Sequence, residues 1–104
     1  MHLNSVQVAG VVKTVPSLTY SRDGVPLLRL LVHVAEETRA GKAFTVGIPV
    51  EVAGDRAEAL AEQLNAGDHV LVSGKLQHRT REDRTSSLGV YGIRVQPLRT
   101  AAAR

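Results

Sequence analysis

The sequence has no cysteine, no tryptophan and few aromatic residues of any kind. Among its 104 residues are two tyrosines and one phenylalanine, at positions Tyr20, Tyr91 and Phe44. Without cysteine, neither a disulfide nor a thiolate metal site can form. No apolar run approaches the roughly 20 residues that a helix needs to cross a bilayer, and the N-terminus has no charged-then-apolar signal segment. We therefore expect a cytoplasmic protein without a membrane partner.

The rest of the composition is that of one ordinary globular domain. Hydrophobic residues make up 43% and charged residues 22% of the chain, which is usual for a globular protein, and the length suits a single core. We expect residues 1–98 to form this domain and residues 99–104 to form a short flexible tail. The formal net charge of +3 permits a polyanionic partner but does not require one.

The stretch from residue 44 to residue 76 organises the chain as strand, helix and strand. Apolar residues alternate through 44–52, which indicates a half-buried strand. Asp55 and Glu58 have the spacing of a capping box, and Gly67 suits the left-handed residue that ends a helix. Between them runs one apolar stripe at helical spacing, formed by Ala57, Leu60, Ala61 and Leu64.

Strand patterns elsewhere in the chain bring the predicted total to five. The predicted strands cover residues 3–13, 25–34, 44–52, 69–76 and 88–95. Asp23-Gly24 marks a turn, and we expect charged loops at 36–42 and 77–87. One face of the second strand is apolar and consists of Leu28, Leu30, Val32 and Val34. The opposite face is amphipathic, which indicates partial exposure or a ligand, and consists of Leu27, Arg29, Leu31 and His33.

This order of elements predicts an all-β protein with an OB-fold. Five strands with one short helix between the third and fourth strands is the order of that small, partly open Greek-key barrel. Gly10 and Gly74 lie in the middle of predicted strands, where strongly coiled barrel strands need corners. Other small β-barrels usually lack a helix at this place, so the pattern favours the OB-fold over them.

Several segments resemble the bacterial single-stranded DNA-binding protein family, and together they cover nearly the whole chain. The segments are Asn4-Ser5-Val6-Gln7-Val8-Ala9-Gly10, Pro16-Ser17-Leu18-Thr19-Tyr20 with Asp23-Gly24, Ala57 and Glu58 with Leu64, and Gly67-Asp68-His69-Val70-Leu71-Val72-Ser73-Gly74-Lys75-Leu76. Within this superfamily, two segments look particularly like the primosomal replication protein PriB, namely Ile48-Pro49-Val50-Glu51-Val52-Ala53-Gly54 and Gly24-Val25-Pro26.

The resemblance implies both a ligand and an assembly. It implies sequence-independent binding of single-stranded DNA in DNA replication, replication restart or repair. It further implies a homodimer or a tetramer that pairs through the first strand, with replication or primosome proteins as additional partners. The family's replicative members end in an acidic tail, whereas this chain ends in a short basic segment, residues 97–104. PriB also lacks that tail, which favours the PriB-like interpretation.

The scarcity of aromatic residues sets this chain apart from the family's DNA-binding members, which stack bases on tryptophan and phenylalanine. Phe44 shares its phase with Val46 and Ile48, and Tyr91 shares the phase of its apolar neighbours, so we expect both rings in the core. Tyr20, on a polar turn, is expected to be exposed. Because base–aromatic stacking contributes about 1–3 kcal/mol per base, we expect weaker and more electrostatic DNA binding.

Basic residues supply the physical case for a nucleic-acid ligand. One cluster lies at the end of the fourth strand and in the following loop, and it comprises Lys75, His78, Arg79, Arg81 and Arg84. In an OB-fold this loop borders the ligand groove, and flexible basic loops can follow a phosphate backbone. The predicted DNA-binding set also includes Lys13, Tyr20, Arg22, Arg29, Arg39, Lys42 and Arg94. Alternatively these are solubilising charges, since Glu82 and Asp83 dilute the cluster.

Catalytic and metal-binding patterns have little support in this sequence. The four histidines are scattered without metal-ligand spacing, and the paired acids Glu36-Glu37 and Glu82-Asp83 fit solvated loops better than acid–base catalysis. Ser73 lacks the glycine that precedes the nucleophile of an elbow motif. We therefore expect no enzyme activity, no metal and no cofactor. A protein-interaction module that kept the barrel and lost the DNA ligand is the alternative function.

Overall fold

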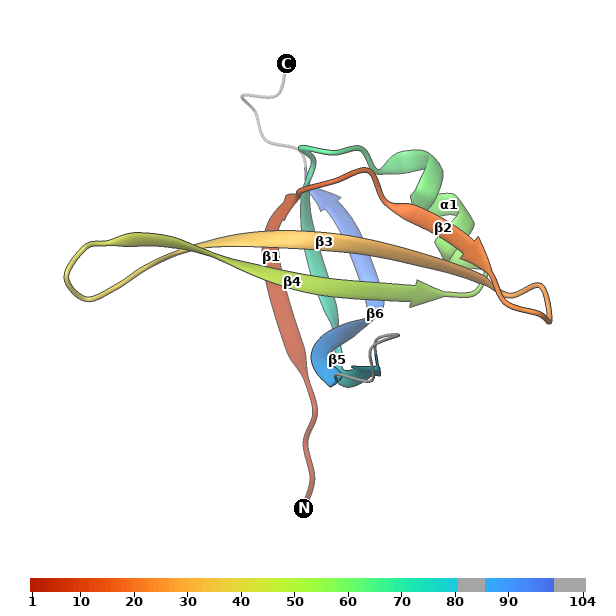
Figure 1. Cartoon of the computed structure of the whole chain (residues 1–104), viewed down its shortest axis with the longest axis horizontal. Helices are drawn as coiled ribbons and strands as arrows, with labels where there is room; N and C mark the ends of the chain where they lie inside the picture. The colour runs from red at the N-terminus through yellow and green to blue at the C-terminus, as the bar shows by residue number, and fades with distance from the viewer. Residues whose placement is uncertain (81–85, 99–104) are drawn as a thin grey trace.

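The computed structural model describes residues 1–80 and 86–98 and is shown in Figure 1. The predicted tail at 99–104, together with Arg81 and Arg84, lies outside these residues. The elements in chain order are β1 (Val6–Val12), β2 (Ser17–Tyr20), β3 (Pro26–Glu37), β4 (Ala43–Ala53), α1 (Asp55–Gln63), β5 (His69–Thr80) and β6 (Ser86–Leu98).

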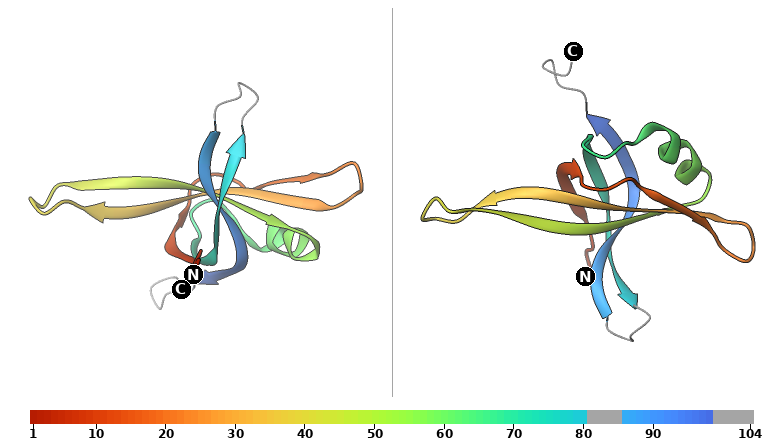
Figure 2. Two further views of the ribbon diagram at one scale, coloured as in Figure 1. Left: turned by 90° about the horizontal axis from the view of Figure 1, so that it is seen from below. Right: turned by 45° about the horizontal axis from the view of Figure 1, so that its top comes forward.

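The sheet closes on itself and forms a five-stranded barrel, as the curved strands of Figure 2 show. The hydrogen-bonded order is β1-β5-β6-β4-β3-β2, and an additional pairing of β1 with β3 completes the ring. Only β4 and β6 pair in parallel, at Val50 with Val90 and Glu51 with Tyr91, among the strands described. Because α1 follows the third barrel strand and precedes the fourth, the predicted OB-fold is confirmed.

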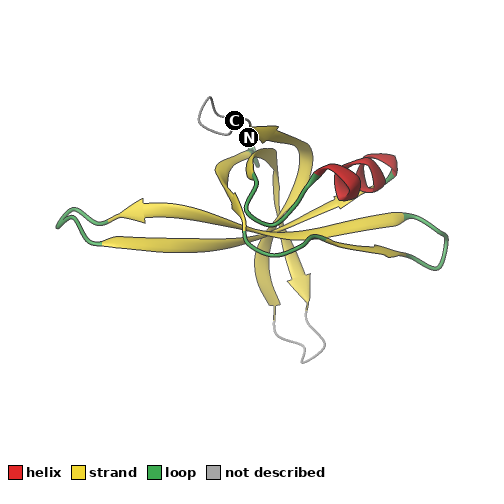
Figure 3. Cartoon of the chain, turned by 90° about the horizontal axis from the view of Figure 1, so that it is seen from above, coloured by secondary structure: helices red, strands yellow, loops and turns green. Residues whose placement is uncertain are grey.

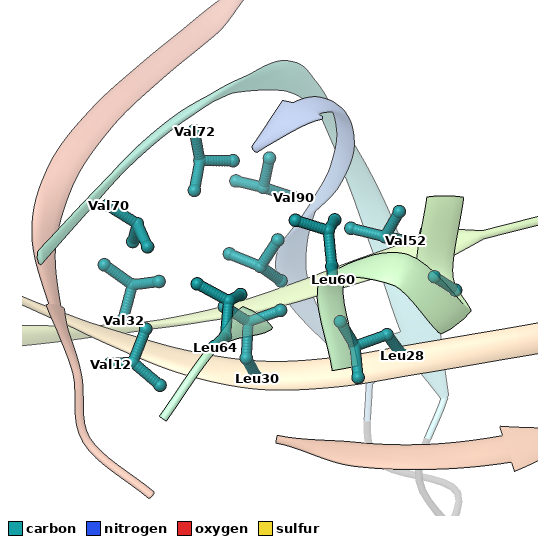
Figure 4. Packing of buried hydrophobic residues seen from close by; sticks show 12 residues of the cluster. Val12, Leu28, Leu30, Val32, Val52, Leu60, Leu64, Val70, Val72 and Val90 are labelled. Carbon is teal, nitrogen blue, oxygen red and sulfur yellow. The ribbon is translucent and has the colours of Figure 1, made fainter. Parts of the chain in front are cut away.

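The core lies inside the barrel and is covered at one side by α1, which Figure 3 shows in red. The side chains gathered there in Figure 4 come from β1, β3, β4, β5, β6 and the helix. The predicted apolar face of β3 is buried at Leu28, Leu30 and Val32. The helix stripe is confirmed as well, because Ala57, Leu60 and Leu64 are buried and Ala61 packs beside them.

Two strand predictions fell short because the segments carry little apolar alternation. The short strand β2 was missed, since Leu18 is its one residue packed against the core. The predicted loop at 77–87 is wrong over its first residues, because β5 continues to Thr80 and pairs with β6 from Ser86 onward.

The beginning of α1 differs from the predicted capping box. Gly54, with φ 93°, is the N-cap residue, Asp55 is already helical, and no side chain caps the helix. The chain leaves β4 through Gly54, whose N–H donates to the carbonyl of Pro26 (3.0 Å), and a positive φ suits glycine there. The helix ends at Gln63, and Gly67, with φ 93°, belongs to the turn that follows.

Both aromatic rings that we expected in the core are exposed instead. Phe44 is 45% exposed because the β3–β4 pair runs on past the barrel as an arm, visible in Figure 1, where its inner side has no covering strand in the described chain. Tyr91 is 38% exposed because β6 contains a bulge. Ser73 pairs with Arg94 and Gly74 pairs with Gly92, so the extra residue between them reverses the alternation along β6.

The two mid-strand glycines lie at close crossings of the barrel, as predicted. A Cβ on Gly10 would collide with the carbonyl of His33 on β3, and a Cβ on Gly74 would collide with the carbonyl of Tyr91 on β6. Neither position has room for a side chain. The corners of this barrel therefore depend on these two residues having none.

Candidate nucleic-acid interface

The amphipathic face of β3 forms the outer face of the barrel together with β4. Cross-strand partners lie on the same side of a sheet, so Arg29 stands beside Glu51, Leu31 beside Pro49, and His33 beside Gly47. Arg29 is exposed, whereas Leu31, His33 and Pro49 are half-buried. The partial exposure predicted for this face is confirmed.

A hollow of about 330 Å³ lies against this outer face, and we call it the outer groove. It is lined by Thr14, Val15, Ser17, Arg29, Leu30, Leu31, Pro49, Val50 and Arg79. The segment between β1 and β2 forms one border, and Arg79 reaches it from β5. Two members of the predicted DNA-binding set, Arg29 and Arg79, thus meet at one site although 50 residues separate them in the sequence.

Glu51 contacts both of these arginines on the outer face. Arg29 Nε donates a hydrogen bond to Glu51 Oε2 (2.9 Å), and Arg79 Nε lies 3.9 Å from the same oxygen. The side-chain amide of Gln77 donates to Glu51 Oε1 at 2.7 Å. The Glu51 side chain is only 17% exposed, so both carboxylate oxygens are held in a partly desolvated place where charge interactions are stronger than in bulk water.

Gly89 opens the path that Arg79 takes. Strand β6 lies between β5 and β4 in the sheet, so a β5 side chain must pass over β6 to approach Glu51. A Cβ at position 89 would lie 2.7 Å from Arg79 Cδ and 3.1 Å from the carbonyl oxygen of Pro49. The arginine therefore crosses β6 where that strand has no side chain.

Tyr91 occupies the same outer surface, contrary to the expectation from its phase. The register places Arg29, Glu51, Tyr91 and Lys75 in one row across β3, β4, β6 and β5. Tyr91 lies between Glu51 and Lys75 in this row, and its exposed ring is a surface on which a nucleic-acid base can stack. The sequence pattern could not predict that Tyr91 is exposed, because the bulge in β6 reverses the alternation of inward and outward residues.

Tyr20 is exposed, as predicted, but its hydroxyl is engaged with the helix. It donates a hydrogen bond to Glu58 Oε2 at 3.0 Å, and this bond, followed by desolvation and the negative charge of Glu58, raises the pKa of Tyr20. Tyr20 lies on the same side of β2 as Leu18, which packs on the core, whereas Ser17 faces Arg29. The ring and Arg29 are therefore on opposite sides of this hairpin.

The other basic residues of the predicted set that the structure describes are exposed and spread around the barrel. Arg22 lies in the β2–β3 turn, Arg39 and Lys42 lie in the β3–β4 loop, and Lys13 follows β1. His78 is on the β5–β6 hairpin, and Arg94 lies opposite Ser73 on β6. The structure thus brings Arg29 and Arg79 together directly, with Lys75 in the same row, and does not gather the other members that lie within residues 1–80 and 86–98. Sequence reasoning missed Glu51, Gln77 and Gly89, which have no basic or aromatic character.

A larger hollow, of about 590 Å³, lies elsewhere and lacks these features. Its lining consists of Gln63, Asn65, Asp68, His69, Pro97 and Leu98, without lysine or arginine among the described residues. No group of three or more metal-ligating side chains occurs in residues 1–80 and 86–98. Within the same residues, no helix is long and apolar enough to cross a membrane.

The closed barrel, the one helix within the described residues and a groove on the outer face that two arginines line together define an OB-fold protein. The chain belongs to the single-strand binding protein family, which matches residues 3–97. This confirms the family resemblance. Members of that family are DNA-binding proteins rather than enzymes, which confirms the expectation of a non-catalytic protein.

Solved structures show the same fold. The wild-type single-stranded DNA binding protein from Thermus aquaticus superposes with a TM-score of 0.84 and 23% sequence identity, over 96% of this chain and 52% of that one. A deletion mutant of the Thermus aquaticus protein gives a TM-score of 0.78 and 25% identity over the same shares of the two chains. The chain thus spans about half the length of these proteins. No curated protein matches it.

Proposed function

We propose that this protein binds single-stranded DNA without sequence preference, with the outer groove as the centre of its binding surface. The observation that carries the proposal is the pair Arg29 and Arg79, which line one hollow on the outer face of an OB barrel. Guanidinium groups bind phosphate oxygens through several donors at once. Phosphate contacts of this kind carry no sequence information. Family membership and the likeness to the Thermus aquaticus protein support the same ligand.

The predicted DNA-binding set extends this surface outward from the groove. Lys75 and Tyr91 continue the row of Arg29 and Glu51 across the barrel. Lys13, Arg22, Arg39 and Lys42 are exposed at the ends of strands and in loops, where they can follow a phosphate backbone as it leaves the groove. We propose a cytoplasmic role in replication, replication restart or repair, with a PriB-like protein as the nearest functional type.

We further propose a homodimer that forms through β1. Residues 6–10 of β1 pair with β5 on one edge, and their other edge has no partner strand within the described residues, since β3 meets β1 at Val11 and Val12. An unpaired strand edge is a template for pairing with a second chain. Light scattering that gives a mass near the 11.1 kDa of one chain at micromolar concentration would exclude the dimer. A fourfold mass would instead indicate a tetramer.

A protein-interaction module is the second candidate function. It is favoured by a hollow of about 180 Å³ between β1, β4 and the β5–β6 hairpin, lined by Val6, Val8, Gly47, Ile48, Pro49, Leu76, Leu88, Gly89 and Val90. Leu76 and Leu88 are exposed there. An apolar recess of this kind accepts an apolar side chain from a partner protein, such as a replication or primosome protein, better than it accepts a phosphate.

Fluorescence anisotropy with labelled poly-dT at low and high salt separates the two functions. The DNA proposal predicts binding in the nanomolar to micromolar range that weakens as salt rises, because each phosphate contact releases counterions. Labelled poly-dA and poly-dC serve as controls for sequence preference and should bind similarly. Failure to bind any of them at low salt would refute the DNA proposal and leave the interaction module.

A further inference from the structure

Glu51 places a negative charge in the surface that we propose for DNA, and this needs an explanation. A carboxylate repels phosphate, so an acid in such a place is expected to weaken binding. The Glu51 carboxylate is not freely solvated, however, because its side chain is only 17% exposed and both of its oxygens accept hydrogen bonds. These contacts indicate that Glu51 has a structural role in this surface, unlike an acid on an exposed loop.

Glu51 orients the guanidinium group of Arg29 by a hydrogen bond and attracts that of Arg79 through a longer ion pair. Arg29 and Arg79 both direct Nε toward Oε2, at 2.9 Å and 3.9 Å, while Gln77 holds Oε1. An arginine has five N–H donors in a rigid fork, so the donors on both Nη nitrogens remain for another acceptor. Both side chains line the outer groove. The two arginines and one glutamate leave one net positive charge at this place.

We propose that Glu51 is a positioning residue that aligns Arg29 and Arg79 as a paired site for one phosphodiester group of the bound strand. The inference rests on the proposed DNA-binding function and deepens it. Groups that are already ordered in the free protein lose less conformational entropy on binding. Glu51 therefore strengthens DNA binding despite its charge, and Gly89 contributes by leaving room for Arg79.

The substitution Glu51→Gln gives the sharpest test, because simple electrostatics and positioning predict opposite results. The change keeps the side-chain size and removes one negative charge, so charge alone predicts tighter binding of poly-dT. Positioning predicts about three- to tenfold weaker binding, the scale of one ordinary hydrogen bond. It also predicts a flatter plot of log K against log salt, by about 0.7 for one lost phosphate contact on a single strand.

Glu62→Gln is the matched control, since Glu62 is exposed on α1 and the same charge is removed there. It should leave the affinity unchanged or slightly higher. Gly89→Ala is the second variant, because its Cβ displaces Arg79 without any change of charge. It should weaken DNA binding and flatten the salt plot in the same direction as Glu51→Gln. Thermal melting of each variant checks that the barrel is intact.

The Nε–H signals of the arginines in an ¹⁵N NMR spectrum provide a readout that does not depend on DNA. The Arg29 signal should be protected from exchange in the DNA-free wild-type protein and lost in Glu51→Gln, with Arg29→Lys used for assignment. Wild-type binding of poly-dT together with tighter binding by Glu51→Gln would overturn this inference and leave the proposed function intact. Failure of the wild-type protein to bind DNA would overturn both.

Discussion

Cations stand in two different settings on this molecule, at the outer groove and at the hairpin tips. Arg29 and Arg79 lie on β3 and β5, and Glu51 contacts both of them, Arg29 at 2.9 Å and Arg79 at 3.9 Å. Arg39 and Lys42, in contrast, are exposed in the loop at the end of the β3–β4 arm, which Figure 1 shows reaching away from the barrel. The groove cations are ordered before a ligand arrives, whereas tip cations must lose side-chain freedom when they bind. Equal charges should therefore contribute unequal affinity.

The largest expected effect is on the stability of the hydrophobic core of the barrel. Leu64→Ala should lower the free energy of unfolding by about 2–5 kcal/mol, as truncation of a buried leucine does, because Leu64 is 2% exposed in the core. Arg39→Ala, at the tip, should change it by less than about 0.5 kcal/mol. Chemical denaturation measures both. Equal stability of the two variants would show that the tip is as much part of the fold as the core.

Next in size is the direct comparison of the two cation pairs. Arg29→Ala with Arg79→Ala should weaken poly-dT binding by about ten- to a hundredfold, since two charge-assisted contacts are lost and Glu51 is left to repel phosphate. Arg39→Ala with Lys42→Ala should weaken it only about two- to fivefold, because exposed ionic contacts contribute little.

The salt dependence of the same two double variants sharpens the comparison. Anisotropy titrations at several salt concentrations should show slopes that are flatter by up to about 1.4 in both cases, because two phosphate contacts are lost in each. A larger affinity loss for the tip pair than for the groove pair would reverse the comparison and move the binding surface to the β3–β4 arm.

Substitution of either tyrosine should reduce DNA affinity by less than loss of the arginine pair does. Tyr91 lies in the row with Arg29, Glu51 and Lys75, so Tyr91→Ala should weaken DNA binding about fivefold or more through lost stacking, with an unchanged salt slope. Tyr20→Ala should have the smaller effect, because Tyr20 lies on the helix side of β2 and bonds to Glu58. Anisotropy at one salt concentration ranks the two variants. A greater loss for Tyr20→Ala would place the strand along β2 instead.

The smallest expected effect is on the pH dependence of stability. Tyr20 links the β2–β3 hairpin to α1 as a hydrogen-bond donor, and its pKa in the folded protein is raised above 10.0. A raised folded-state pKa means that the stabilisation is fully present below the unfolded pKa and is lost as pH rises through the folded pKa. Thermal melting between pH 9 and 11 should therefore show a decline that Tyr20→Phe reduces. Identical declines in both proteins would argue against this link.

The barrel could be predicted from the sequence because its signals are local and periodic. Alternation in β3 and β4 and the stripe Ala57, Leu60 and Leu64 each specify one buried face. The missed features depend on three-dimensional placement. Strand β2 offers one core residue, and the arm that exposes Phe44 depends on where the neighbouring strands end.

The candidate site was predictable in part for the same reason. Arg29 was identified on an amphipathic face and Arg79 in a basic cluster, but their meeting at one hollow required the closure of the barrel. The alternation of apolar residues in β4 correctly predicts that Glu51, between the buried Val50 and Val52, faces outward. Its role follows from Arg29 opposite it and from Arg79 crossing β6 at Gly89, and neither relation is encoded by spacing along the chain.

The bulge in β6 changes which residues of the strand face the barrel interior. On the C-terminal side of the bulge, odd-numbered residues such as Val95 pack on the core. On its N-terminal side, even-numbered residues such as Val90 face the core instead. A single extra residue thus separates these two phases. Ile93 is the unpaired residue of the bulge, so its deletion would give a regular ladder in which Tyr91 still pairs with Lys75 on the outer surface and Val90 stays in the core.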